Sequence, residues 1–134
     1  MHLNPYLYFN GHCEAAFRFY EKCLNGKIAF MMTYEGSPMA DQAPRGWEKK
    51  ILHGTLNVGA MILQGADSPQ QEIAKGFSLA LSMDTPADAE RTFHALAENG
   101  KIQLPIQETF WAVRFGMVID KFGMPWMVSC EKSQ

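Results

Sequence analysis

One stretch of the amino-acid sequence occurs twice, and this duplication constrains the fold more than any other feature of the chain. The tetrapeptide Asn-Gly-Lys-Ile at residues 25–28 recurs at residues 99–102, an offset of 74. A four-residue match can arise by chance, but the same offset aligns similar residues before the tetrapeptide. These pairs are Leu7 with Leu81, Phe9 with Met83, Asn10 with Asp84, Glu14 with Asp88, Ala15 with Ala89 and Phe19 with Phe93. Repetition at one offset indicates that a structural unit is present in two copies.

The first copy has the pattern of a strand, a helix and three further strands. Residues 3–9 are rich in aromatic and aliphatic side chains, which favours a strand. A helix is expected next, because apolar residues follow at helical spacing. Its predicted buried face comprises Ala15, Ala16, Phe19 and Cys23. Asn25 and Gly26 are typical of the left-handed conformations that end a helix. The later strands are expected at residues 27–34, 50–58 and 60–65.

The second copy repeats this order. A strand is expected at residues 77–83, and Thr85 with Pro86 is typical of a helix N-cap followed by the first helical residue. The later strands are expected at residues 101–108, 111–119 and 124–130. Aligning Gly59 with Gly123 in the last hairpins reduces the offset to 64, which a longer loop at residues 35–48 explains. The sequence therefore predicts an α+β fold of two tandem βαβββ modules that form a curved mixed sheet. We expect one domain over residues 1–134, with module 1 at about 1–67 and module 2 at about 76–131.

Composition restricts the partners and the compartment. A formal net charge of −2 provides no basic surface for a phosphate backbone, so we expect no nucleic-acid partner. No apolar run approaches the roughly 20 residues that span a bilayer, and the N-terminus lacks signal-peptide features, so we expect no membrane partner. Three cysteines without CxxC spacing argue against a disulfide framework and favour a cytoplasmic protein. Only 19% of the residues are charged, and we expect a second subunit to cover part of the apolar surface.

Several segments resemble a known protein superfamily. Paired βαβββ modules are the architecture of the vicinal oxygen chelate superfamily, which includes glyoxalase I, extradiol dioxygenases and fosfomycin and bleomycin resistance proteins. The chain resembles its PhnB-like branch in PYLYF at residues 5–9, EAAFRFY at 14–20, ILHGTL at 51–56, TFWA at 109–112 and FGMVIDKFGMPWMV at 115–128. The resemblance implies the glyoxalase/bleomycin resistance/dihydroxybiphenyl dioxygenase fold. It also implies a homodimer, because two chains complete the ligand cup in many relatives.

The resemblance further implies where a metal ion would bind. Metal-dependent members use His, Gln or Glu near the start of the first strand and midway along the last strand of each module. The two offsets assign these positions to Asn4 and Ser78, and to Leu63 and Met127. Asn and Ser are weak ligands, Leu cannot ligate, and a Met thioether suits Cu(I) rather than Mg, Mn, Ni or Fe. A shift of one residue would substitute Gln64 for Leu63 but would reverse the face of that strand. We therefore expect no metal ion and no other cofactor.

His53 is the candidate catalytic residue. By the geometry of the superfamily, the strand face that it shares with Ile51, Thr55 and Asn57 should look into the cup, and the offset of 64 pairs it with Met117. An imidazole there would act as a general base or would donate a hydrogen bond to a ligand. Alternatively, His53 is structural and bonds to Thr55 or to a neighbouring strand.

The other expected ligand contacts are aromatic and Met side chains. Tyr6 and Tyr8 would line the cup with hydroxyl groups available for hydrogen bonds, and Trp111 would lie at or near its rim. The full expected ligand-binding set is Tyr6, Tyr8, His53, Trp111, Met117 and Met127. Alternatively, these side chains fill the interior of the sheet. Arg114 and Glu108 would bind a charged substrate or would pair with other charges at a surface.

These observations favour a metal-independent dimeric protein that binds an unidentified small molecule, since Met side chains adapt to irregular apolar ligands. A second hypothesis is a metal-dependent lyase, isomerase or dioxygenase of the same superfamily, with His53 in its site. A third is an interaction or regulatory dimer whose own side chains fill the cup. PhnB-like proteins often carry a demethylubiquinone methyltransferase name, but the chain contains no GxGxxG motif of the kind that holds S-adenosylmethionine.

Overall fold

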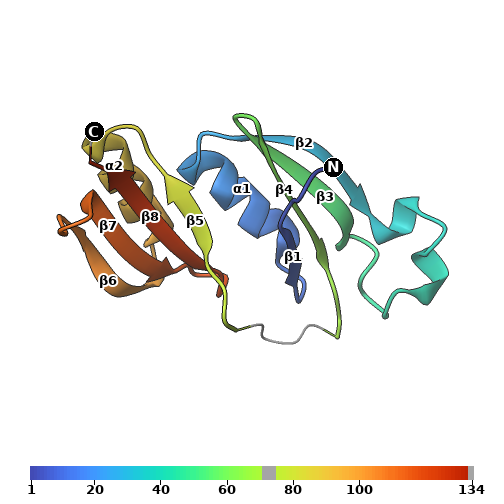
Figure 1. Ribbon diagram of the computed structural model, residues 1–134. Helices are drawn as coiled ribbons and strands as arrows, with labels where there is room; N and C mark the ends of the chain where they lie inside the picture. Colours follow the sequence, from blue (N-terminus) through green and yellow to red (C-terminus); the bar gives the residue numbers. More distant parts are fainter. Residues whose placement is uncertain (71–74, 133–134) are drawn as a thin grey trace. The chain divides into compact units, whose positions relative to one another are not determined.

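The chain forms two compact units, Met1–Ile73 and Ala74–Gln134. The computed structural model describes residues 1–70 and 75–132 (Figure 1). Among these residues, no helix is long and apolar enough to cross a membrane.

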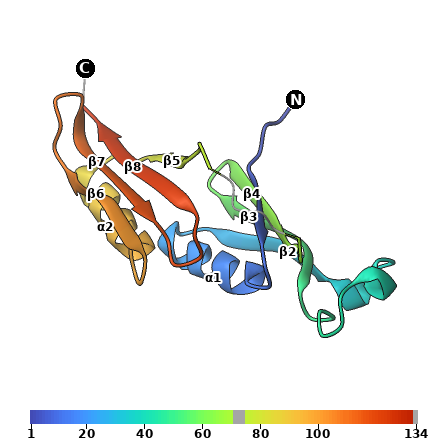
Figure 2. The ribbon, with the colours of Figure 1, turned by 90° about the horizontal axis from the view of Figure 1, so that it is seen from below.

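The first unit is a four-stranded sheet with a helix against one of its faces (Figures 1 and 2). Its elements are β1 (Tyr6–Phe9), α1 (Cys13–Cys23), β2 (Lys27–Thr33), the 3-10 turns η1 (Tyr34–Gly36) and η2 (Ala40–Gln42), β3 (Ile51–Val58) and β4 (Met61–Asp67). The strands lie in the order β1-β4-β3-β2. Strand β1 runs parallel to β4, and the other neighbours are antiparallel.

The second unit repeats this topology. Its elements are β5 (Leu79–Ser82), α2 (Pro86–Leu96), β6 (Lys101–Gln107), β7 (Ala112–Ile119) and β8 (Pro125–Glu131). The strands lie in the order β5-β8-β7-β6, with β5 parallel to β8 and the other neighbours antiparallel. The prediction of two βαβββ modules, each with a mixed four-stranded sheet, is confirmed.

Phe17 forms the centre of the contact between α1 and its sheet. Its side chain is fully buried, and its ring meets the Phe9 ring edge-on with 6.4 Å between centroids. Gly54 and Gly65 leave room for this ring, because a Cβ atom at Gly65 would lie 2.9 Å from the Phe17 ring. The second unit has the same arrangement, since a Cβ atom at Gly116 would lie 2.8 Å from the ring of the fully buried Phe93.

The buried face of α1 differs from the predicted one. Ala15 is exposed and Phe19 is half-buried, although both were expected in the core. The residues that α1 buries are Cys13, Ala16, Phe17, Tyr20 and Cys23. The prediction is confirmed for Ala16 and Cys23 and wrong for Ala15 and Phe19. Apolar residues occur on more than one side of this helix, so helical periodicity alone does not select which side faces the sheet.

The predicted helix ends are confirmed. Asn25 and Asn99 adopt left-handed conformations with φ of 53° and 54°, so the repeated Asn-Gly reverses the chain in both units. Thr85 caps α2, because its hydroxyl oxygen accepts a hydrogen bond of 3.1 Å from the backbone N–H of Asp88.

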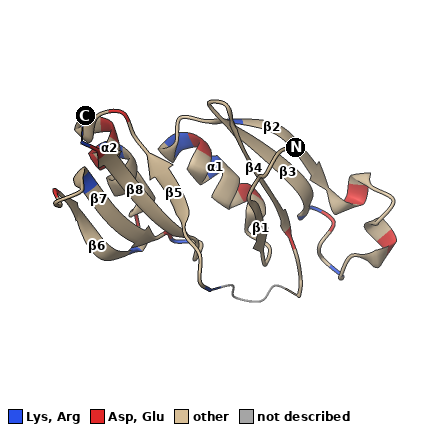
Figure 3. Cartoon of the chain, viewed as in Figure 1, with Lys and Arg blue, Asp and Glu red and all other residues tan. Residues whose placement is uncertain are grey.

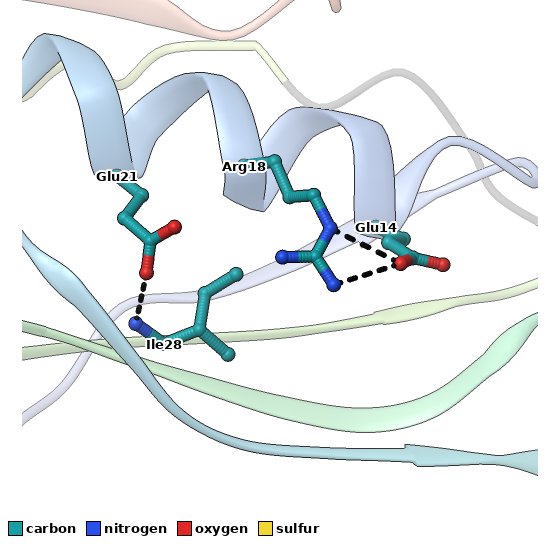
Figure 4. A network of polar contacts seen from close by, with 4 residues as sticks. All are labelled: Glu14, Arg18, Glu21 and Ile28. Carbon is teal, nitrogen blue, oxygen red and sulfur yellow. Dashed lines mark hydrogen bonds and ion pairs between the residues drawn. The ribbon is translucent and has the colours of Figure 1, made fainter.

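Figure 4 shows polar contacts made by two parts of α1, one between Glu14 and Arg18 and the other between Glu21 and Ile28. The Glu14 and Arg18 side chains form an exposed ion pair of 3.1 Å within one helical turn. The carboxylate of Glu21 accepts a hydrogen bond of 2.7 Å from the backbone N–H of Ile28. This second contact fixes the start of β2 to the end of α1, whereas the exposed ion pair adds little stability.

A buried aspartate organises each unit, and neither role was predicted from sequence patterns. The Asp67 carboxylate accepts hydrogen bonds of 2.9 Å from the backbone N–H groups of Gly11, Cys13 and Ile51. It therefore joins the start of α1 and the start of β3 to the end of β4. In the second unit, the Asp120 carboxylate accepts hydrogen bonds from the backbone of Phe122 and Met124 and from the Trp126 indole.

The three cysteines are expected to be unreactive in the folded protein. All three are free thiols with buried side chains. Burial, followed by the nearby Asp67 and Glu14 carboxylates, raises the pKa of Cys13, so the reactive thiolate is scarce at neutral pH. At pH 8, Ellman's reagent should titrate none of the thiols within minutes in the native protein and all three in denaturant. Rapid reaction of Cys13 in the native protein would contradict this expectation.

Candidate functional site

The face of the first sheet that is turned away from α1 carries the candidate site, and we call it the open face. Directly paired residues of neighbouring strands lie on the same face of a sheet. Tyr6 pairs with Gln64, Gln64 with Thr55, and Thr55 with Phe30. These four residues form a row across all four strands, which we call the polar row. The next row contains Gly65 and Gly54, which contact Phe17 of the helix, so the polar row lies on the opposite face.

His53 lies beside the polar row on β3, two residues from Thr55. The Tyr6 hydroxyl and the His53 Nδ1 share a hydrogen bond of 2.9 Å. The two rings lie 27° from coplanar with 5.6 Å between centroids. The Phe30 ring, on the neighbouring strand β2, lies 6.1 Å from the imidazole. Tyr8 extends the cluster, because its ring lies 5.2 Å from that of Tyr6. The predicted residues Tyr6, Tyr8 and His53 thus lie together.

The cluster of Tyr6, Tyr8, His53 and Phe30 contains no Lys, Arg, Asp or Glu side chain. Burial raises the pKa of Tyr6, with a smaller contribution from Tyr8, so the phenol keeps its proton at neutral pH. No Lys, Arg, Asp or Glu occurs in β1 or β3 (Figure 3). This part of the open face offers a phenol, an imidazole and an amide between aromatic rings, whereas Lys27 of β2 pairs with Asn57 farther along the same face.

The amide of Gln64, one member of the polar row, makes no hydrogen bond within the part of the chain that the structure describes, although this side chain is half-buried. The His53 Nε2 has only a long contact of 3.5 Å to the Thr55 hydroxyl. Both groups have unused hydrogen-bonding capacity on the open face.

The corresponding row of the second sheet is apolar. It contains Ala80, Met127, Met117 and Leu104, which pair across β5, β8, β7 and β6. The predicted residues Met117 and Met127 are therefore neighbours on one face. Trp111, at the start of β7, is about half exposed and meets the rings of Phe110 and Phe115 at 4.7 and 5.4 Å between centroids.

The register corrects the assignment of Leu63. Gln64, and not Leu63, occupies the position in the first sheet that Met127 occupies in the second, because each pairs with the equivalent residue of the first strand, Tyr6 or Ala80. Leu63 pairs with the fully buried Leu56 and lies on the helix face.

Leu63 was wrongly assigned because the offset of 64 treats Gly59 and Gly123 as equivalent residues of the two hairpins. In the first unit the last hairpin closes between Val58 and Met61, whereas in the second it closes between Ile119 and Pro125. Because these hairpins differ in length, Gly59 and Gly123 are not equivalent, and the offset of 64 displaced β4 by one residue. The residue of module 1 that is equivalent to Met117 is likewise Thr55 and not His53, because Thr55 pairs with Gln64 as Met117 pairs with Met127.

Arg114 and Trp126 both have structural roles in the second unit. Arg114 forms an ion pair of 3.1 Å with Glu90 of α2 and donates to the backbone carbonyl of Val113. Trp126 is buried on the helix face, and its indole N–H donates to Asp120.

Sequence reasoning missed the contribution of Phe30 and set Gln64 aside. Phe30 carried a detectable signal, because it alternates with Met32 along β2 and pairs across to the face of Thr55. The signal for Gln64 was the two-residue turn at Gly59 and Ala60, which fixes the register of β4.

The side chains of the two rows do not fit a divalent cation. Within residues 1–70 and 75–132, no group of three or more His, Cys, Asp or Glu side chains is arranged to hold a metal ion. The polar row provides a phenol, an amide and a hydroxyl, and the apolar row provides two thioethers. Asn4 and Ser78 lie just before β1 and β5 and add only neutral oxygen atoms. Mg, Mn, Ni and Fe prefer carboxylate or imidazole ligands.

Comparisons with known proteins agree with the fold. The family model of the Glyoxalase/Bleomycin resistance protein/Dioxygenase superfamily matches residues 2–128. Protein YjdN of Escherichia coli is 35% identical over 144 residues, covering 100% of this chain and 98% of YjdN. Protein PA1353 of Pseudomonas aeruginosa is 43% identical with a TM-score of 0.89, covering 99% of both chains. A PhnB protein of Bacillus cereus is 24% identical with a TM-score of 0.82, covering 97% of this chain and 99% of that one, which shows the shared fold. The chain therefore belongs to the Glyoxalase/Bleomycin resistance protein/Dioxygenase superfamily and is similar over its whole length to YjdN and PA1353.

Proposed function

We propose that this chain is a metal-independent protein that binds a small molecule on the open face of its first sheet. The observation that carries the proposal is the hydrogen bond between Tyr6 and His53 beside the polar row. It holds an imidazole between aromatic rings on a half-exposed surface, where a ligand would meet both apolar contact area and hydrogen-bonding groups. Gln64 adds an amide that is available for a further hydrogen bond.

The proposal excludes a catalytic metal because of the donor set. One imidazole, one amide and neutral oxygen atoms would bind a divalent cation weakly. Protein purified with EDTA should therefore bind ligands with the same affinity as protein to which Mg²⁺, Mn²⁺ or Ni²⁺ has been added. Stoichiometric metal that survives a chelator wash would contradict this part of the proposal.

The binding surface is tested by NMR with a fragment set under EDTA. The set would include aromatic and aliphatic, neutral and charged compounds, and we expect neutral aromatic fragments to shift backbone signals of β1, β3 and β4 most strongly. His53→Gln should weaken these fragments by about tenfold, because one hydrogen bond to the ligand is lost. Arg18→Gln is the control, because Arg18 lies exposed on α1 in an ion pair with Glu14 (Figure 4).

Fragment-induced shifts that occur elsewhere, or that survive His53→Gln unchanged, would contradict the proposed surface. If no fragment of any class shifts the backbone signals of the open face, the result favours the hypothesis of an interaction or regulatory dimer, which acts through protein contacts.

We further propose that the chain is a homodimer. The second unit exposes Phe110 to 89% and Trp111 to 51%, and together with Phe115 they form a continuous aromatic cluster. Exposed clusters of large apolar side chains are typical of interaction surfaces. Sedimentation should give about twice the chain mass of 15.1 kDa, and Trp111→Lys should shift the population to monomer. A monomeric wild-type protein at high micromolar concentration would contradict this.

The alternative is an enzyme of the superfamily, a lyase, isomerase or dioxygenase, and one observation favours it. The Tyr6 hydroxyl holds the His53 imidazole at a fixed position, as the orienting partner of a general base does. Deuterium incorporation from D₂O into a bound fragment, lost in His53→Gln, would favour the enzyme over the binding protein.

A further inference from the structure

The hydrogen bond between Tyr6 and His53 determines more than the position of the imidazole. A neutral imidazole carries one proton, and the hydrogen bond at one ring nitrogen decides whether the other nitrogen donates or accepts. The direction of the 2.9 Å contact between the Tyr6 hydroxyl and His53 Nδ1 therefore decides which ligands His53 can recognise.

The chemistry of the two groups assigns this direction. A phenol is a more acidic donor than a neutral imidazole N–H, and an imidazole nitrogen is a more basic acceptor than a phenol oxygen. The favourable arrangement has the Tyr6 O–H donating to Nδ1. The raised pKa of Tyr6, caused first by burial, keeps the proton on the phenol.

The second nitrogen is then an N–H donor with a weak partner. Its contact with the Thr55 hydroxyl is 3.5 Å, longer than the roughly 2.7–3.2 Å of an ordinary N–H···O hydrogen bond. A ligand oxygen that approaches Nε2 more closely would replace this contact without leaving a strong hydrogen bond unmade.

The surroundings of the imidazole define the rest of the ligand. The Tyr6 ring on β1 lies 27° from coplanar with the imidazole, and the Phe30 ring lies on the neighbouring strand β2, so the donor is set in a surface of aromatic rings. Flat conjugated molecules bury most of their surface against such rings. The strands β1 and β3 contain no Lys or Arg, and Lys27 of β2 pairs with Asn57, four residues along β3 from His53, so the cluster around the imidazole holds no cation that would compensate a strongly anionic ligand.

We propose that Tyr6 fixes His53 in the tautomer that carries its proton on Nε2, so that the open face selects flat, uncharged molecules bearing a carbonyl oxygen. Tyr6 is then a positioning residue, and His53 is the residue that touches the ligand. This proposal rests on the proposed function for its ligand class, but the tautomer is a property of the ligand-free protein.

The tautomer is tested first, by ¹⁵N NMR of the His53 imidazole in the protein without ligand. We expect Nδ1 to be unprotonated and Nε2 to be protonated in the wild-type protein. Tyr6→Phe should convert this single species into a mixture of the two neutral tautomers. Tyr8→Phe is the matched control, because it removes a phenol from the same strand and face while keeping the Tyr6–His53 hydrogen bond.

A proton on Nδ1 in the wild-type protein would overturn the assignment, since Tyr6 would then accept. An unchanged tautomer in Tyr6→Phe would overturn the positioning role of Tyr6. Neither result depends on finding a ligand, so the failure of this inference is distinguishable from the failure of the proposed function.

The ligand class is tested with three probes. Benzamide is flat and carries a carbonyl oxygen, cyclohexanecarboxamide keeps the carbonyl but is not flat, and toluene keeps the ring but lacks the carbonyl. We expect benzamide to bind about tenfold more tightly than either control, and Tyr6→Phe to reduce the advantage over toluene by the fraction of His53 that the NMR spectrum shows in the other tautomer. Equal binding of benzamide and toluene to the wild-type open face would overturn the selection for a carbonyl oxygen.

Discussion

Replacing Asp67 with Asn is expected to lower the free energy of unfolding by about 3 kcal/mol, because hydrogen bonds to a buried charged group contribute about 1.5–3 kcal/mol each. The carboxylate accepts three backbone N–H groups, two at one oxygen atom and one at the other. An amide keeps only one acceptor oxygen and directs an N–H₂ group toward a backbone donor. Gly11 and Cys13, or Ile51, would therefore lose their acceptor within a buried site.

Urea unfolding followed by circular dichroism measures this loss. Asp41→Asn is the control, because Asp41 is an exposed residue of η2 and the same chemical change there removes no buried hydrogen bond. We expect the control to stay within about 0.5 kcal/mol of the wild-type protein. Equal stability of Asp67→Asn and Asp41→Asn would show that the three backbone contacts do not stabilise the fold.

Replacing Phe17 with Ala is expected to lower the free energy of unfolding by about 3–5 kcal/mol, the range for removing a buried aromatic side chain from a core. The Phe17 ring is fully buried against Phe9 and fills the space over Gly54 and Gly65. Gly54 and Gly65 carry no side chains that could fill this space, so the substitution leaves a cavity.

Phe19→Ala is the matched control, because it makes the same change on the same helix and alters helix propensity equally. Phe19 is half-buried, and we expect a loss of about 1 kcal/mol. The same urea titration separates the two variants. An equal loss, or a larger loss for Phe19→Ala, would support the helix orientation that the sequence pattern predicted and would contradict the structure.

Local patterns predicted the repeated parts of the fold well. The Asn of each repeated Asn-Gly ends its helix in a left-handed conformation, because Asn tolerates a positive φ better than most residues with a side chain. Thr85 and Pro86 mark the start of α2 by a side-chain cap and a missing backbone donor. These signals depend on a few consecutive residues, so a single sequence contains them.

The candidate site was predicted only in part. Alternation along single strands was enough to group Tyr6 with Tyr8 and to place His53 on the same face as Thr55, and the structure brings these residues together. The position of β4 beside them depends on the hairpin that precedes it. Because that hairpin is shorter than its counterpart in the second unit, Gln64 rather than Leu63 completes the polar row.

The sequence by itself determined the duplication, the βαβββ order of each module and the ends of the helices, because each follows from repeated residues or local backbone preferences. Only the tertiary structure decided which side of α1 meets its sheet, which strand register sets Gln64 beside Tyr6, and which buried carboxylates hold the loops. The physical reason is that these features depend on pairing between residues far apart in the chain, where a shift of one position exchanges the two faces of a strand. The same reason explains why the hydrogen bond between Tyr6 and His53, 47 residues apart, emerged only from the fold.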